Sequence, residues 1–347
     1  MLRLLFLAVG LAAAAHAEPP RDVLHWQKLP ALPDALGFAG SYAGVIDDAL
    51  FVAGGANFPD GPPWSGGAKI WHDRVFLLEN PDGHWQPAGQ LPKPSGYGVS
   101  LTLPEGVLLI GGGDAHANFA DVWLARRSAN TLRFDPLPSL PRPLAQHAGA
   151  RLGRTVYIAG GLDHPDARTA QPVFFALDLD RIADGWRELE PWPGPERILA
   201  TAATQDGAFF LFGGARLVPG PDGKPQREWL RDAWRFRPGE GWKRLADLPA
   251  PIVAAPSPAP AIAQSRILLL GGDDGAQIDV PPESHRGFPR VVRAYHTVTD
   301  TWSDAGSLPF SLVTTPVVSW RGNWIVPGGE SQPAVRSTEI WSGSASR

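Results

Sequence analysis

The sequence predicts an all-β fold, and a repeat with two markers is the main reason. Six short apolar runs each end in a pair of glycines, and consecutive pairs begin 49 to 58 residues apart. Each of the first five pairs is followed by a Trp or Phe and then by Leu-Pro or Trp-Pro. Self-similarity at about 50 residues is typical of kelch-type propeller blades. We therefore expect residues 18–347 to form a single six-bladed kelch-type β-propeller. The glycine pairs are Gly54-Gly55, Gly111-Gly112, Gly160-Gly161, Gly213-Gly214, Gly271-Gly272 and Gly328-Gly329.

Within each repeat, the spacing of the markers leaves room for four strands. In the first repeat, residues 42–46 and 49–53 flank a turn at Asp47-Asp48, and the second of these runs leads into Gly54-Gly55. A third strand follows, and a fourth carries Trp85 before Leu91-Pro92. Glycine at the end of the second strand lets the backbone turn sharply and lets blades approach closely. Most of the 14 Trp residues recur at one place in the repeat, so we assign them to the core between blades.

The two ends of the chain together complete the last blade. After Gly328-Gly329 the sequence offers a third strand at residues 336–341 but no fourth. The run from His25 to Pro30 reads as a fourth strand and precedes the first repeat. We expect this N-terminal strand to complete the sixth blade, because ring closure removes exposed sheet edges.

Residues 1–17 predict a signal peptide. Arg3 gives a positive start, an apolar stretch follows, and Ala15-His16-Ala17 is a small-x-small cleavage pattern. We therefore expect export and a periplasmic location. The chain has no cysteine, which excludes disulfides, thiolate metal sites, cysteine nucleophiles and the cysteine-dependent copper site of galactose oxidase-like propellers.

The remaining composition argues against several partners. The net charge is −4 without a long basic or acidic run, so we expect neither nucleic acid nor a membrane surface as partner. No His-x-x-x-His pair and no Gly-x-Ser-x-Gly elbow occurs. We expect no metal and no cofactor, although a metal site assembled from several blades stays open. The oligomeric state is not indicated.

Several polar residues lie where propeller loops converge on the central shaft. Arg142 and Arg197 follow the prolines that end two blades, and a pair of guanidinium groups there could bind a carboxylate. Exposed loop arginines are the alternative. Asp273-Asp274 follows a glycine pair and is either a pair of functional carboxylates or, more simply, a turn capped by aspartates.

The last repeat and the first insertion hold the other candidates. Glu330 directly follows Gly328-Gly329 and precedes Arg336 by six residues. A partly desolvated glutamate at the mouth of the shaft could exchange protons near neutral pH, whereas a surface Glu-Arg pair is the alternative. Trp64 and Trp71 lie in or just after the insertion at residues 59–69, where an aromatic ring could face a cavity.

The segment Gly-Glu-x-x-Pro-x-x-Arg, residues 329–336, resembles the corresponding segment of the N-acetylneuraminate epimerases, or sialic acid mutarotases. The resemblance extends from about Trp26 to Trp341 and is to the cyclically permuted branch of these periplasmic six-bladed kelch proteins. This chain has Ala334 where the epimerases carry Gly. The other segments that carry the resemblance are residues 38–40, 54–59, 71–73, 195–200, 271–275 and 312–316.

The resemblance implies a cofactor-independent sugar isomerase. Its substrate would be N-acetylneuraminate or a related sialic acid, a small sugar acid whose α and β anomers exchange through ring opening. Glu330 is then the catalytic base, Arg197 the leading carboxylate clamp and Arg336 a second clamp or the group that orients Glu330. Arg142, Asn57 and Trp71 are further substrate-binding candidates. Two alternatives remain: a non-catalytic kelch propeller that binds a glycan or a protein, and an isomerase that acts on another sugar.

Overall fold

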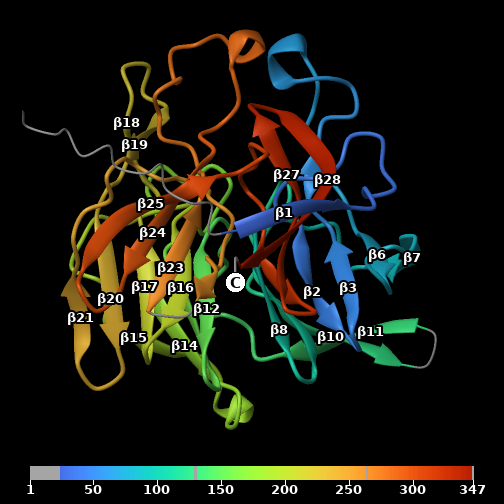
Figure 1. The fold of residues 1–347 in the computed structure, drawn as a ribbon, viewed down its shortest axis with the longest axis horizontal. Helices are drawn as coiled ribbons and strands as arrows, with labels where there is room; N and C mark the ends of the chain where they lie inside the picture. Colours follow the sequence, from blue (N-terminus) through green and yellow to red (C-terminus); the bar gives the residue numbers. More distant parts are fainter. Residues whose placement is uncertain (1–23, 129–130, 263–264, 346–347) are drawn as a thin grey trace, which may run out of the picture.

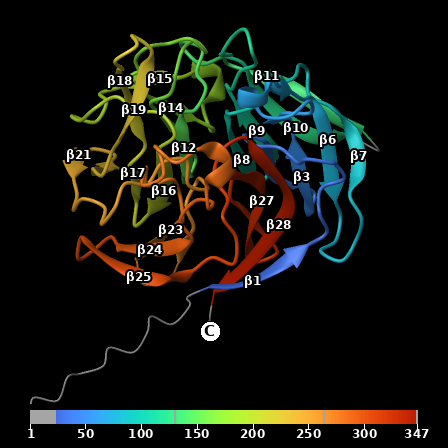
Figure 2. The ribbon, with the colours of Figure 1, turned by 90° about the horizontal axis from the view of Figure 1, so that it is seen from above.

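A computed structural model describes residues 24–128, 131–262 and 265–345; the predicted signal peptide lies outside these residues. The described chain forms six four-stranded antiparallel sheets arranged radially around a central axis (Figure 1, Figure 2). This arrangement confirms the predicted six-bladed propeller. No helix in the described residues is long and apolar enough to cross a membrane.

The four strands of each blade follow one another from an inner strand to an outer strand. Blades 1 to 3 consist of β2 (Tyr42–Ile46), β3 (Ala49–Ala53), β6 (Arg74–Leu78) and β7 (Gln86–Gln90); β8 (Val99–Leu103), β9 (Gly106–Ile110), β10 (Val122–Ser128) and β11 (Thr131–Leu137); and β12 (Ala148–Leu152), β13 (Thr155–Ala159), β14 (Phe174–Asp178) and β15 (Arg187–Leu189). Blades 4 to 6 consist of β16 (Thr201–Gln205), β17 (Ala208–Phe212), β20 (Ala233–Arg237) and β21 (Gly241–Arg244); β22 (Ala261–Ile262), β23 (Arg266–Leu270), β24 (Val291–His296) and β25 (Thr301–Ser307); and β26 (Val318–Trp320), β27 (Asn323–Gln332), β28 (Val335–Ala345) and β1 (Leu24–Leu29).

The sixth blade is closed by the N-terminal strand, as predicted. β1 pairs antiparallel with β28, and Trp26 lies opposite Gly343. The indole ring of Trp26 covers this glycine so closely that a Cβ there would lie 2.7 Å from a ring carbon. Any side chain at Gly343 would therefore push the closing strand away from its partner.

The apolar core lies between neighbouring blades rather than in one central mass. Separate buried clusters fill the six junctions, such as the one that joins blades 3 and 4. Several of the repeated tryptophans add a polar link across a junction. The indole N–H of each donates at 2.8 to 3.1 Å to a backbone carbonyl at the end of the preceding blade, which explains why Trp recurs at one repeat position. These four donors are Trp85, Trp186, Trp242 and Trp302.

A closed ring of six backbone hydrogen bonds joins the blades around the shaft. In each blade, a residue two to seven positions ahead of the inner strand donates its N–H to the carbonyl of the corresponding residue in the adjacent blade, at 2.7 to 2.9 Å. All six have a left-handed backbone with φ between 55° and 69°, although five are not glycine, so the fold imposes this geometry. In donor order the ring runs Gly40, Thr314, Ala254, Leu199, Gln146, Tyr97 and back to Gly40.

Insertions after the second strands of blades 1, 4 and 5 project from the same face of the propeller (Figure 1). They contain the short pair β4 (Ala56–Asn57) and β5 (Ile70–Trp71) with the 3-10 turn η1 (Pro63–Ser65), the hairpin β18 (Ala215–Pro219) and β19 (Pro225–Trp229), and η3 (Pro282–Ser284). A further 3-10 turn, η2 (Ile182–Asp184), lies between β14 and β15 of blade 3.

Candidate functional site

A cavity of about 640 Å³ opens above the hydrogen-bonded ring, on the face from which the insertions project. Five of the six ring residues line its floor, all except Gly40. The insertions of blades 1, 4 and 5 form its walls, and the hairpin between β27 and β28 completes them. The fold therefore places a cavity where propeller loops converge.

Glu330 occupies a repeat position that the fold directs toward the shaft. It directly follows the glycine pair of blade 6, and its backbone exchanges two 2.9 Å hydrogen bonds with Val313, next to ring residue Thr314. The equivalent positions of blades 1 to 5 make the same isolated bridge. Only blades 5 and 6 place a carboxylate there, so both acidic groups face the cavity from adjacent blades. The five equivalent residues are Ala56, Gly113, Leu162, Ala215 and Asp273.

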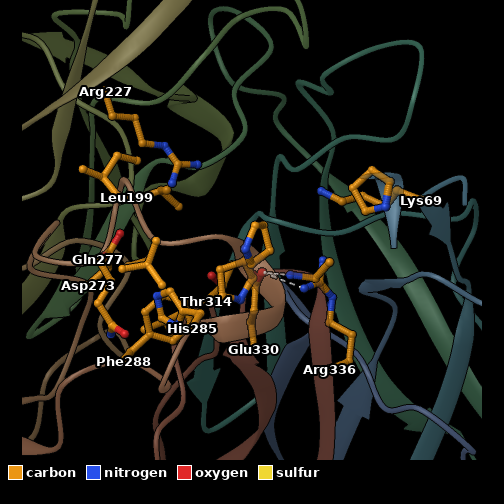
Figure 3. Close-up of a pocket in the computed structure, with 18 of the residues that line it drawn as sticks. Lys69, Leu199, Arg227, Asp273, Gln277, His285, Phe288, Thr314, Glu330 and Arg336 are labelled. Atoms are coloured by element: carbon orange, nitrogen blue, oxygen red, sulfur yellow. Dashed lines mark hydrogen bonds and ion pairs between the residues drawn. The ribbon is translucent and has the colours of Figure 1, made fainter. Parts of the chain in front are cut away.

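The Glu330 carboxylate is fixed by its own hairpin (Figure 3). Glu330 on β27 lies opposite Arg336 on β28, and Arg336 Nη1 is 2.9 Å from Glu330 Oε1. The backbone N–H of Ala334, in the intervening turn, donates to the same oxygen at 2.8 Å. Both contacts fall on Oε1, and within the described residues Oε2 accepts no hydrogen bond from the protein. One carboxylate oxygen is therefore held by the hairpin, and Glu330 lines the cavity.

Arg336 is itself held tightly. Its side chain is only 3% exposed, its Nε donates to the carbonyl of Ala56 at 3.1 Å, and its guanidinium lies 4.9 Å from the centre of the Phe58 ring. The expected Glu-Arg pair is thus present inside a cavity rather than on an open surface. Of the two roles expected for Arg336, this geometry favours orientation of Glu330.

The structure does not place Arg197 where it could act as the expected carboxylate clamp. Its side chain is 1% exposed and forms two hydrogen bonds with Asp232, at 3.0 and 2.6 Å. Further hydrogen bonds reach the carbonyls of Gly213 and Pro195. Burial lowers the pKa of the Arg197 guanidinium, and the Asp232 carboxylate opposes that shift. Arg197 therefore stabilises the loop that leads to ring residue Leu199.

Two other expected substrate contacts also lie outside the cavity lining. Arg142 donates to the side chain of Gln171 at 3.0 Å. Asn57 is buried, with its amide bonded to the carbonyl of Gly37 at 3.1 Å and to His72 Nε2 at 2.8 Å. These contacts give both residues a structural role, Asn57 in the blade 1 insertion and Arg142 between the loops of blades 2 and 3.

Trp71 and the aspartate pair lie nearer to the site. Trp71 lines a smaller hollow that adjoins the cavity. Asp273 and Asp274 each cap a turn, because they accept the backbone N–H of Gly275 and Ala276 at 2.9 and 3.0 Å. Asp273 lines the cavity as well, so the capped turn expected from the sequence also brings a carboxylate to the site.

The sequence did not single out Lys69 or Arg227, the two other cationic residues of the cavity. Both come from insertions, Lys69 from blade 1 and Arg227 from β19 of blade 4, and they extend from opposite sides of the view in Figure 3. Trp64, half-exposed in η1, lines the rim. Their position in insertions after a glycine pair was the one signal of a role in the site. The sequence of an insertion does not indicate which of its side chains point into the cavity.

A narrower hollow of about 80 Å³ continues beneath the ring. Its wall includes Ser41, Ser100, His147, Ser257 and Thr315. Burial lowers the pKa of His147 to about 4, so its imidazole is neutral at pH 7. Among the described residues, no group of three or more His, Asp or Glu side chains is arranged to hold a metal ion.

Comparisons with known proteins agree on one family. A sequence model described as N-acetylneuraminate epimerase matches residues 10–135 and 137–280; Glu330 and Arg336 lie outside these residues. A protein of that name from Haemophilus influenzae (strain PittEE) is 26% identical over 244 residues, 62% of this chain and 60% of that protein. Another, from Yersinia pestis (strain Pestoides F), is 41% identical over 108 residues, 26% of each chain.

The alignments therefore span about 60% or less of the length of these relatives. The solved structure described as "Structure of YjhT" has the same fold, with a TM-score of 0.64 at 15% identity over 90% of this chain and 95% of that one. Because the family model matches well over half of its residues, this chain belongs to the N-acetylneuraminate epimerase family.

Proposed function

We propose that this protein interconverts the α and β anomers of N-acetylneuraminate or a related sialic acid, with Glu330 as the catalytic base. The observation that carries the proposal is the Glu330 carboxylate that lines the cavity and is held through Oε1 by Arg336 and the backbone of Ala334. Family membership supports the substrate class. The volume of the cavity, about 640 Å³, lies within the range typical of small-molecule sites.

The reaction needs proton transfer and positioning. A sialic acid is a cyclic hemiketal, so a base removes the proton of the anomeric hydroxyl while an acid protonates the ring oxygen. The bond between the anomeric carbon and the ring oxygen breaks, and an open-chain ketone forms. Closure on the other face of the ketone reverses both transfers and gives the other anomer. No atom or electron is gained or lost, so we propose that no cofactor takes part.

Arg336 has a supporting part in this scheme. Its contacts with Ala56 and Phe58 hold the guanidinium in place, and the guanidinium in turn holds Glu330 Oε1. A base fixed in this way does not have to be ordered when the substrate arrives. The cavity and its fixed carboxylate favour an enzyme over the non-catalytic glycan- or protein-binding propeller that the sequence left open. The predicted signal peptide supports a periplasmic site of action.

The test follows the anomers of freshly released α-N-acetylneuraminate by NMR. We expect wild-type protein to accelerate the approach to the β anomer. Glu330→Gln keeps the shape of the side chain and an oxygen for the Ala334 N–H but cannot accept a proton, so the catalysed rate should fall by roughly a hundredfold or more. Glu240→Gln, at a 55% exposed glutamate paired with Arg235 and Arg237, is the matched control and should keep the wild-type rate.

Two results would contradict the proposal. A wild-type rate equal to that of buffer rules out the sialic acid activity. A Glu330→Gln rate equal to wild type leaves the activity intact but assigns the wrong base.

A further inference from the structure

The charges that line the cavity are unbalanced. Three cationic side chains, Lys69, Arg227 and Arg336, face two carboxylates, Asp273 and Glu330. Arg336 is already paired with Glu330. Within the described residues neither Lys69 nor Arg227 forms an ion pair. The cavity therefore carries a net positive charge on a chain whose overall charge is −4, and that charge favours an anionic ligand.

Lys69 is oriented by aromatic rings. Its ammonium nitrogen lies 4.6 Å from the ring centre of Tyr97, 5.1 Å from that of Trp71 and 6.0 Å from that of Phe58. Aromatic faces attract a cation through their quadrupole and restrict its position, but they do not neutralise its charge. A carboxylate partner would cancel most of the field at the site. The three rings thus leave Lys69 available to a ligand anion.

The aromatic neighbours are attached to the most constrained parts of the site. Tyr97 belongs to the hydrogen-bonded ring, and its backbone φ is fixed at 62°. Trp71 lies in β5, which pairs with β4 at Ala56. Their backbones are therefore restrained before a ligand binds. A preorganised cation loses little conformational entropy when it binds an anion.

Lys69 shares the neighbour Phe58 with the Arg336 that holds the proposed base, whereas Arg227 extends from the opposite side of the cavity. The centre of the Phe58 ring lies 6.0 Å from the Lys69 ammonium nitrogen and 4.9 Å from the Arg336 guanidinium, and Arg336 is paired with Glu330. Arg227 extends from the other side of the cavity, on the β18–β19 hairpin (Figure 3). In a sialic acid the carboxylate and the reacting hydroxyl are attached to the same carbon. A base at Glu330 therefore requires the carboxylate-binding cation to be close to Glu330.

We propose that Lys69 binds the carboxylate on the anomeric carbon and thereby restricts the substrate to 2-keto sugar acids. The inference rests on the proposed function, because it takes Glu330 as the base. It replaces Arg197 with a residue from the blade 1 insertion. A sugar without this carboxylate would leave the Lys69 ammonium without an anionic partner.

The test measures binding of a probe that cannot react. The methyl glycoside of N-acetylneuraminate cannot open its ring, and its methyl ester removes the negative charge with little change in shape. Dissociation constants of the acid and the ester are measured by calorimetry for wild type, Lys69→Met and Lys69→Arg. Lys93→Met is the matched control, because Lys93 also lies on an aromatic ring, 4.0 Å from the centre of Phe119, but outside this cavity.

We expect wild type and Lys93→Met to bind the acid more tightly than the ester. Loss of one charge-assisted contact in Lys69→Met should weaken acid binding by roughly tenfold to a hundredfold and leave ester binding within about twofold. Lys69→Arg should restore most of the preference for the acid. An unchanged preference in Lys69→Met, or the same loss in Lys93→Met, would overturn the assignment.

The proposed function is judged separately, by the anomer exchange rate. Tight binding of the acid without any catalysed exchange would refute the isomerase and leave the Lys69 site standing. Catalysed exchange together with equal affinity of wild type for the acid and the ester would refute the Lys69 site and leave the isomerase standing.

Discussion

Replacing Asp232 by Asn should destabilise the propeller strongly, because it leaves a buried guanidinium without its carboxylate. The side chains of Arg197 and Asp232 are 1% and 9% exposed. Asn retains one acceptor oxygen but no charge, so the Arg197 cation stays buried without a counterion. Removing one partner of a buried ion pair costs about 3 to 5 kcal/mol.

This free energy translates into a measurable shift of the melting temperature. The unfolding entropy is about 2.1 cal/mol/K per residue, so for about 320 residues 1 kcal/mol corresponds to roughly 1.5 °C. Asp232→Asn should therefore melt about 4 to 8 °C below wild type in a thermal unfolding experiment at pH 7.

The control is an ion pair from the same blade that is open to solvent. Glu228 and Arg216 are 48% and 39% exposed. Glu228→Gln should change the stability by about 0.5 kcal/mol or less, which is under about 1 °C. If Asp232→Asn melts at the same temperature as Glu228→Gln, the structural role given to the Arg197–Asp232 pair is wrong.

Three further predictions concern His147, Ala334 and the signal peptide. The pKa of buried His147 is held at about 4, below its ordinary value of 6.5, so the unfolded chain takes up the proton first as the pH falls. The free energy of unfolding, measured with urea, should therefore fall by about 2 kcal/mol between pH 7.5 and pH 5. His147→Gln should remove this part of the pH dependence, and an equal fall in both proteins would refute the prediction. Ala334 has a left-handed φ of 60°, so Ala334→Gly should raise the free energy of unfolding by about 0.5 to 1 kcal/mol, and a decrease of that size would count against strain in the turn. N-terminal sequencing of the exported protein should begin at Glu18, after cleavage behind Ala17; a start at Met1 would contradict the signal peptide.

The sequence was sufficient to predict the features that recur from blade to blade. Glycine pairs mark the same backbone turn in every blade, and the strand-borne tryptophans mark the same link to the preceding blade, so both show as a period. The Glu330–Arg336 pair was also predictable, because its members face each other across one hairpin and their spacing in the chain determines the register.

Contacts between distant parts of one blade, and side chains carried by insertions, do not recur with the repeat, so the sequence did not predict them. Arg197 was predicted to bind the substrate carboxylate because its partner Asp232, 35 residues further on and beyond an intervening hairpin, could not be recognised from the sequence. Lys69 was hidden for another reason: the insertions differ between blades, so no repeat position predicts which of their side chains turn inward. The rings around Lys69 come partly from blade 1 and partly from the loop before blade 2, and only the folded structure brings them together.

The closed ring of backbone hydrogen bonds has an electrical consequence for the cavity above it. Each of the six peptide N–H groups points along the circle at the carbonyl of the adjacent blade, so the individual bond dipoles run head to tail and cancel around the circuit. All six donors are consumed in this way, and none is left to bind a ligand. The floor is therefore close to electrically neutral, and selectivity rests on side chains such as Lys69 and Arg227. The insertions can thus change which molecule is recognised while the circuit that holds the blades together stays the same.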